Sequence, residues 1–138
     1  MRLLIDADII LDVLQNRKPH VYDSAKVWKL CEINKAEGYV SALTFTNLVC
    51  IMRKELMPQK ISEVLRSLAL IFQFEDLTVS DMLKAADLEW EDYEDALQAV
   101  TAERIHADCI VTRNTADFTN SKTPALTPSE FLAGLYKK

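Results

Sequence analysis

Carboxylates gather in three short segments of this sequence. The first segment, LIDADIILD, holds Asp6, Asp8 and Asp12 around the end of an apolar stretch. Asp95 lies in the second, YEDALQAVTAE, and Asp117 lies in the third, VTRNTADF. Two carboxylates ~4 Å apart repel each other by about 4 kcal/mol at an effective dielectric constant of about 20, so acids that meet in a fold usually hold a cation. Oxygen ligands without Cys or His suit Mg²⁺ or Mn²⁺, and such an ion on a few carboxylates is the arrangement of metal-assisted phosphodiester hydrolysis.

Each segment also has an explanation that needs no chemistry. Asp6 or Asp8 could cap the helix that follows the first apolar stretch. The acids of the second segment fall in a first helical turn, where negative charge complements the helix dipole. Asn and Asp are common turn formers, which accounts for the third segment. The three segments together are therefore more informative than any one of them.

Short apolar runs alternate with longer amphipathic stretches along the chain. The runs predict strands at residues 3–5, 39–42, 74–79, 109–111 and 125–126. The amphipathic stretches predict helices at residues 9–14, 22–35, 44–56, 62–72, 80–89, 93–106 and 128–136. This alternation predicts βαβ units and a parallel sheet with helices on both faces. In such sheets ligands bind beyond the carboxyl ends of the strands, so the polar residues after strands 3–5 and 109–111 would share one cleft if those strands are neighbours.

Capping and breaking residues set the expected element boundaries. Asp23, Ser80 and Asp92 are expected to cap the helices that begin near them. Gly38 is expected to end the second helix, and Pro58 to break the third.

Composition narrows the class of protein. The 138 residues suffice for one domain, spanning 1–138, and 49% hydrophobic with 27% charged residues is typical of a globular protein. The net charge of −5 argues against a broad basic surface for nucleic acid, because phosphate binding depends largely on Lys and Arg. The negative net charge is still compatible with an enzyme that acts on nucleic acid, because a bound metal ion can supply positive charge locally.

The three cysteines indicate a reducing compartment. Cys31, Cys50 and Cys109 are odd in number and each sits among apolar residues, so we expect all three to be small core residues. The sequence shows no zinc-binding spacing, no signal peptide and no run of ~18 apolar residues, so we expect a cytoplasmic protein.

Four segments in order, LLIDADIILDVL, YVSALTFTNLV, DYEDALQAVTAE and CIVTRNTADF, resemble a PIN domain. The resemblance covers nearly the whole chain and is greatest to compact bacterial PIN proteins that include the VapC-type toxins of toxin–antitoxin pairs. It implies a three-layer α/β/α fold with a parallel sheet of about five strands in the order 3-2-1-4-5. It also implies cleavage of RNA with Mg²⁺ or Mn²⁺ at an acidic pocket, and a separate antitoxin that occludes this pocket.

Carried over by position, the family's acids fall on Asp6, Asp95 and a residue of the turn after the fourth strand. Asn114 and Asp117 are both candidates for that turn residue, and Asp117 is preferred because a carboxylate binds the ion better than an amide. The family's second acid is commonly a Glu, and this sequence has Asn47 there, which provides an oxygen ligand but no charge.

Other residues are expected near the pocket. Thr44, Thr112, Arg113 and Asn114 are candidates for contacting the substrate, and Arg113 is the best choice for phosphate because a guanidinium can bind it in two places. A plain surface charge on a turn is the other explanation for Arg113. Asp8 could partly restore the charge that is missing at position 47.

Two other functions compete with a metal-dependent ribonuclease. Asn47 stands where the family commonly has a Glu, and this difference favours a PIN-fold protein that binds RNA or a partner and cleaves little or nothing. Asp6-x-Asp8 after a strand is also found in aspartate-nucleophile phosphatases, but Ile9 and Ile10 do not resemble the turn of that family. A homodimer surface that includes Phe131, Leu135 and Tyr136 is an alternative to ordinary core packing of these residues.

Overall fold

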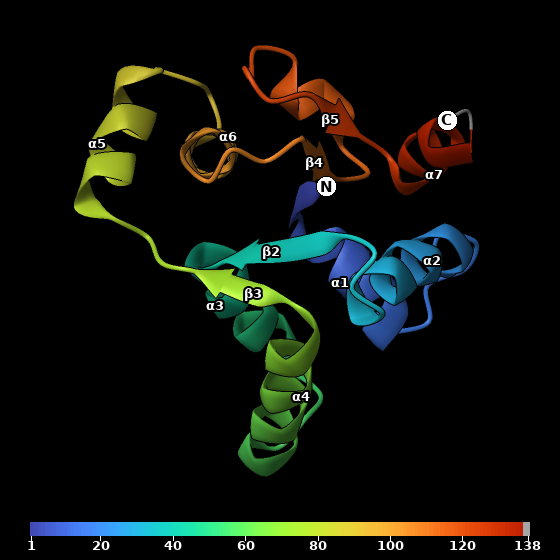
Figure 1. The fold of residues 1–138 in the computed structure, drawn as a ribbon. Coiled ribbons are helices and arrows are strands. Elements are labelled where there is room, and N and C mark those ends of the chain that lie inside the picture. The colour runs from blue at the N-terminus through green and yellow to red at the C-terminus, as the bar shows by residue number, and fades with distance from the viewer. Residues whose placement is uncertain (137–138) are drawn as a thin grey trace.

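A computed structural model, which describes residues 1–136, contains a five-stranded parallel sheet in the order β3-β2-β1-β4-β5 (Figure 1). Both the fold class and the strand order expected from the resemblance are confirmed. The strands are β1 (Arg2–Ile5), β2 (Glu37–Ser41), β3 (Gln73–Glu75), β4 (Cys109–Val111) and β5 (Ala125–Leu126).

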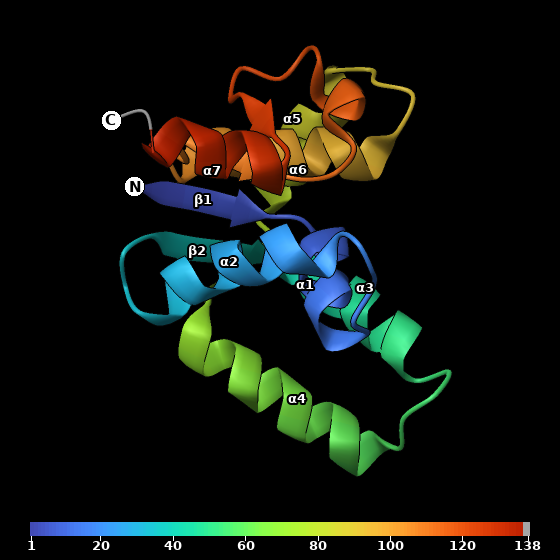
Figure 2. The same ribbon diagram turned by 90° about the vertical axis from the view of Figure 1, so that its right-hand side faces the viewer.

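Helices cover both faces of the sheet (Figures 1 and 2). One face carries α1 (Ala7–Leu14), α2 (Val21–Glu32), α3 (Ala42–Met52), α4 (Pro58–Ile71) and α7 (Pro128–Tyr136). The other carries α5 (Val79–Asp87), α6 (Tyr93–Arg104) and the short 3₁₀ helix η1 (Thr115–Phe118).

The central strand β1 explains the two-sided core. Leu3 and Ile5 point into the larger apolar cluster beneath α1, α2 and α7, whereas Leu4 points into the cluster beneath α6. All three side chains are buried, because successive residues of a strand face opposite sides of a sheet that is covered on both. This is why the strand appears in the sequence as a continuous apolar run.

Gly38 lies inside β2, so the expectation that it ends the second helix is wrong. That helix, α2, already ends at Glu32. A Cβ at position 38 would lie 2.7 Å from both Cys31 Sγ and Phe72 Cδ1, so only glycine allows α2 and Phe72 to approach this strand so closely.

Two of the three expected caps are wrong. Asp23 lies within the first turn of α2 and caps nothing, and α5 is capped by Thr78 instead of Ser80. Thr78 and Asp81 form a reciprocal capping box, which fixes the start of α5 two residues earlier than Ser80 would. The cap of α6 is confirmed, since the Asp92 side chain accepts a hydrogen bond from Asp95 N at 3.1 Å.

Pro58 and Cys50 also differ from expectation. Pro58 occupies the first turn of α4, where its missing N–H costs no hydrogen bond, and α3 ends before it at Met52. Cys31 and Cys109 are buried as expected, but Cys50 is exposed on α3. Residues 1–136 contain no helix that is long and apolar enough to cross a membrane.

Candidate active site

The sheet brings the three acidic segments to one edge. β1 and β4 are adjacent and parallel, with Ile5 opposite Val111, so the residues that follow them leave the sheet side by side. Asp6 N donates to Val111 O at 3.0 Å, which fixes that exit. The helix α6 begins at the same edge because it runs back across the sheet before β4 starts. The expectation that the polar ends of strands 3–5 and 109–111 meet is therefore confirmed.

Asp6 is both a helix cap and a member of this edge. Its Oδ1 accepts a hydrogen bond from Ala7 N at 2.8 Å, and its Oδ2 accepts one from Thr112 Oγ1 at 2.8 Å. Thr112 is fully buried and its hydroxyl contacts Asp6, and its expected contact with substrate stays a prediction. Asp6 can therefore cap α1 and also belong to a group of acids that binds a cation.

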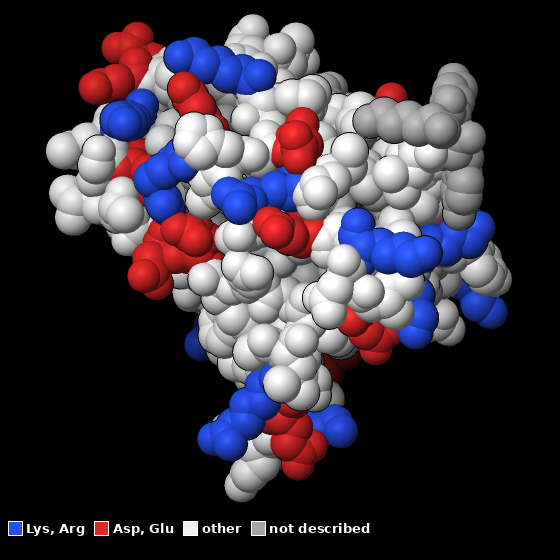
Figure 3. Space-filling view, viewed as in Figure 1, with Lys and Arg blue, Asp and Glu red and all other residues white. Residues whose placement is uncertain are grey.

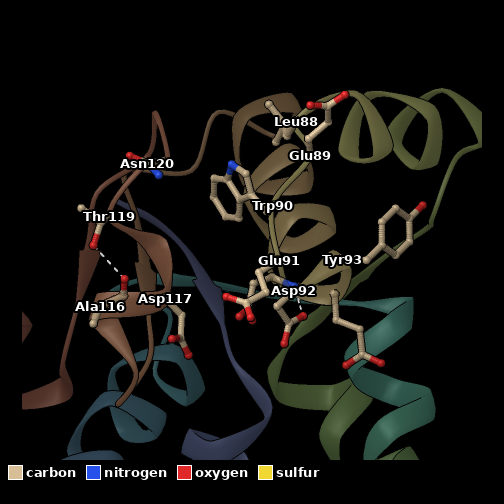
Figure 4. A pocket seen from close by; sticks show the side chains of 12 residues that line it. Leu88, Glu89, Trp90, Glu91, Asp92, Tyr93, Ala116, Asp117, Thr119 and Asn120 are labelled. Carbon is tan, nitrogen blue, oxygen red and sulfur yellow. Dashed lines mark hydrogen bonds between the residues drawn. The ribbon is translucent and has the colours of Figure 1, made fainter.

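A cleft of about 1310 Å³ opens beside this edge (Figure 4). One wall is the segment 88–95, which leads into α6, and the other is the segment 116–120 after β4. Every charged residue that lines it is acidic: Glu89, Glu91, Asp92, Glu94, Asp95 and Asp117. We call this the acidic cleft. The opposite end of the sheet, where the chain begins, carries Lys and Arg mixed with Asp and Glu (Figure 3).

Asp95 has carboxylates on several sides. Its pKa is raised to about 6, first by partial burial and then by the negative charges of Asp92, Asp117, Asp6 and Glu94. Asp6, Asp95 and Asp117 come from three separate elements, so this repulsion is a consequence of the tertiary fold. Without a cation, the Asp95 carboxyl therefore keeps its proton to a higher pH than an ordinary aspartate does.

Asp8 lies behind Asp6 and contacts the turn after β4. Its Oδ2 accepts hydrogen bonds from Arg113 N at 3.1 Å and Asn114 Nδ2 at 3.4 Å. Its Oδ1 is buried without a partner in the described structure, and burial followed by the charge of Asp6 raises the pKa of Asp8 to about 6. The amide nitrogen of Asn114 is directed to Asp8, whereas Asp117 lines the acidic cleft, and the preference for Asp117 stays a prediction.

Arg113 is held by a buried carboxylate. Its Nε and Nη2 donate to the two oxygens of Asp12 at 3.0 and 3.1 Å, and Asp12 also accepts a hydrogen bond from Ser24 Oγ at 3.0 Å. Asp12 is completely buried. In this arrangement the guanidinium ties the turn after β4 to α1, and its contact with phosphate stays a prediction.

Asn47 faces Glu94, an acid in the first turn of α6. Asn47 Nδ2 lies 3.5 Å from Glu94 Oε2, at the far limit of a hydrogen bond. A Glu at position 47 would instead place two negative charges against each other. The missing charge at position 47 was the signal that could have pointed to a compensating acid, but sequence spacing did not show that α3 and α6 meet here.

A second polar pair joins α3 and α6 one turn deeper. Gln98 Nε2 donates to Thr44 Oγ1 at 3.0 Å, and both side chains are buried. Gln98 Oε1 has no partner in the described structure. Thr44 therefore contributes to the junction of the two helices, and its expected contact with substrate stays a prediction.

The oxygen atoms at this edge are suitable ligands for a hard divalent cation. All are carboxylate or amide oxygens, the ligand type that Mg²⁺ and Mn²⁺ prefer, and their mutual repulsion favours a cation. Within residues 1–136, however, no three His, Cys, Asp or Glu side chains are grouped closely enough to form a ready metal site. Ion binding would therefore have to draw the carboxylates together.

The chain matches one family model in sequence, and it matches several solved structures in fold. The family model described as "PIN domain" matches residues 2–116. No curated protein matches the chain in sequence.

Three solved structures illustrate the likeness in fold. A chain of a toxin–antitoxin complex from Klebsiella pneumoniae is 20% identical, with 91% of this chain and 97% of that chain covered and a TM-score of 0.69. A chain of VapBC2 from Rickettsia felis, bound to a promoter DNA fragment, is 15% identical, with coverage of 92% and 98% and a TM-score of 0.70. A chain of FitAcB from Neisseria gonorrhoeae is 18% identical, with coverage of 92% and 98% and a TM-score of 0.64.

Proposed function

This chain belongs to the PIN-domain family, and we propose that it is a metal-dependent ribonuclease, the toxin of a toxin–antitoxin pair. The observation that carries the proposal is the acidic cleft, whose charged lining residues are all carboxylates and which lies at the carboxyl edge of β1 and β4. Such a cleft repels RNA unless it holds a cation. Ligands of parallel sheets bind at this edge, so the position of the cleft also supports the proposal.

We assign Asp6, Asp95 and Asp117 as the ligands of one or two Mg²⁺ or Mn²⁺ ions, with Asn47 as a fourth ligand through its amide oxygen. When bound, the ion supplies an activated water for attack on the phosphodiester and neutralises charge on the phosphate. Glu94 contributes the negative charge that a family Glu at position 47 would have supplied.

The chain's own residues hold these ligands in place. Thr112 and Ala7 N fix the two oxygens of Asp6, and Asp92 fixes the backbone of Asp95 through the helix cap. Asp12 holds the turn before Asp117 through Arg113. The proposed ligands therefore stand on elements that the rest of the fold keeps rigid.

An antitoxin protein is the proposed partner. The Klebsiella pneumoniae structure is a toxin–antitoxin complex of the same fold, and the sequence resembles VapC-type toxins, which supports such a pairing. A cytoplasmic location belongs to the same proposal, because the proposed RNA substrate is there.

Purified protein incubated with single-stranded RNA tests the function. We expect cleavage with Mn²⁺ or Mg²⁺ and none with chelator, because the proposed cleft needs a cation to accept phosphate. Products should carry no 2′,3′-cyclic phosphate, since water and not the 2′-hydroxyl attacks. Asp117→Asn should lose the activity, whereas Glu63→Gln, an exposed acid on α4, should keep it.

Two results would overturn the proposal. Cleavage that persists in chelator, or that Asp117→Asn leaves unchanged, would come from a different site or a contaminant. RNA binding without cleavage at any metal concentration would favour the alternative motivated by Asn47, a PIN-fold protein that binds RNA or a partner.

A further inference from the structure

A second cavity of about 710 Å³ lies next to the acidic cleft. It is enclosed by α5, α6 and the segment 120–122 that leads to β5. The two hollows share Leu88, Trp90 and Asn120 in their linings, so they adjoin each other at these residues. In Figure 4 the Trp90 indole stands between α6 and the loop that carries Thr119 and Asn120.

The second cavity differs from the acidic cleft because it contains cationic side chains. Lys84, Arg104 and Lys122 line it together with His106 and three acids, Asp81, Asp87 and Glu103. Arg104 is already committed to acids, with Nε 2.9 Å from Asp81 Oδ2. The two lysines are the cations available to a ligand.

Neither lysine is tightly held. The side chain of Lys122 is 81% exposed, and its only ion pair among residues 1–136 is a 3.5 Å contact with Glu103. Lys84 forms no ion pair with any residue in that part of the chain. Exposed pairs of this length contribute little stability, so a phosphate can compete for both ammonium groups.

Apolar groups form another part of the cavity wall. Leu88, Ala99 and Val100 lie beside Trp90, whose ring contacts Phe118 edge-on at a centroid distance of 6.5 Å. Ser121 Oγ, also in the lining, is buried without a partner in the described structure. The Trp90 ring can stack on a nucleobase, the unpaired Ser121 hydroxyl can bind a polar base edge, and the two exposed lysine side chains can contact phosphate.

We propose that this cavity binds one nucleotide of single-stranded RNA that flanks the phosphate held in the acidic cleft. The base stacks on Trp90, and the adjoining phosphates contact Lys84 and Lys122. This inference rests on the proposed function, since continuity with the acidic cleft selects RNA as the occupant. It also answers a difficulty of that function, because a cleft whose charged lining residues are all acids offers RNA no cation of its own beyond the metal.

Fluorescence of Trp90 tests the site without any cleavage. In a Trp28→Phe variant Trp90 is the only tryptophan. A single-stranded ribohexanucleotide added at low salt, with Ca²⁺ present to neutralise the acidic cleft, should quench its emission. If Trp28→Phe does not fold, the difference between the parent and Trp90→Phe gives the same signal.

Lysine variants test the phosphate contacts, with a matched control of equal charge. Lys84→Ala/Lys122→Ala should weaken binding at least roughly five-fold and lower the slope of log Kd against log salt by about 1.4, the value for two contacts with a single strand. Lys29→Ala/Lys60→Ala, on α2 and α4 across the sheet, should change neither. Equal affinity and slope in the two double variants, or no quenching, would overturn the nucleotide site.

Cleavage assays separate this inference from the proposed function. If the parent cleaves RNA with Mn²⁺ and Lys84→Ala/Lys122→Ala has an unchanged KM, the function stands and the second site is wrong. If quenching and the lysine effects appear but no metal supports cleavage, the nucleotide site stands and the ribonuclease proposal fails.

Discussion

Two groups of carboxylates in this protein have opposite surroundings. Asp12 and Asp81 are buried, and each is bound through both oxygens by one arginine, Arg113 and Arg104 respectively. Asp6, Asp95 and Asp117 form no ion pair within residues 1–136, and the charges of Asp117 and Asp6 help to raise the pKa of Asp95.

The difference separates acids that folding alone explains from acids that the proposed function would explain. A buried carboxylate without a counter-charge is costly, so the paired acids are explained by folding alone. The unpaired acids gain nothing for folding from their proximity, and a missing counter-charge points to a ligand that supplies it. Asp6 and Asp12 show that the two groups interleave within a single segment of the sequence.

Asp95→Asn should have the largest effect on function and little effect on folding. We expect metal-dependent RNA cleavage to fall by at least about a hundred-fold, since even outer-shell changes at metal sites cost ten- to a hundred-fold. Removing one of several repelling charges should leave the metal-free protein equally or more stable. Cleavage rates and thermal unfolding in chelator measure the two effects. A variant that melts lower in chelator yet still cleaves would make Asp95 a helix-start residue only.

Asp12→Ala should have the reverse profile. It leaves the Arg113 guanidinium, largely buried, without its carboxylate, and we expect a loss of about 3 kcal/mol in the free energy of unfolding. Urea denaturation measures this loss, and Glu63→Gln is a control at an exposed acid. A loss below about 1 kcal/mol, typical of exposed pairs, would show that Asp12 does not belong to the paired group.

An exchange of charge between Asn47 and Glu94 tests whether Glu94 belongs to the unpaired group. Glu94→Gln should weaken Mn²⁺ binding about ten-fold, because the site loses a carboxylate. The double variant Asn47→Glu/Glu94→Gln moves the charge to α3 and should return the affinity to within about three-fold of the parent. Calorimetric titration with Mn²⁺ gives both values.

The outcome of that exchange is decisive for Glu94. If Glu94→Gln binds Mn²⁺ as the parent does, Glu94 only complements the helix dipole. If the double variant stays as weak as Glu94→Gln, position 47 cannot supply a ligand charge.

The smallest effect expected is on the pH dependence of the metal-free protein. The folded-state pKa values of Asp8 and Asp95 are raised to about 6, above the ordinary value of 3.8. The folded state therefore binds protons more tightly, and its stability should fall as pH rises from about 4 to about 6. The Asp8→Asn/Asp95→Asn variant should lose this part of the decline. Urea denaturation in chelator at pH 4.5 and 7 measures it, and an unchanged decline would contradict the raised pKa values.

Much of the fold could be predicted from the sequence because its signals are local. The apolar runs of β1 and β4, the cap at Asp92 and the short β5 were found from neighbouring residues alone. The boundaries that failed depend on contacts between distant elements. Gly38 is such a case, because its reason for being glycine is the approach of Cys31 and Phe72 from other elements.

The sequence by itself determined which residues could hold a cation, but it did not determine which of them are free to do so. The resemblance to the PIN family selects Asp6, Asp95 and Asp117 as candidates, and the same segments also contain Asp8, Asp12 and Arg113. Only the tertiary structure pairs Arg113 with Asp12, turns Asn114 toward Asp8 and brings Glu94 beside Asn47. The physical reason is that an acid's role depends on the charge nearest to it in space, and parallel strands joined by crossovers make those neighbours distant in sequence.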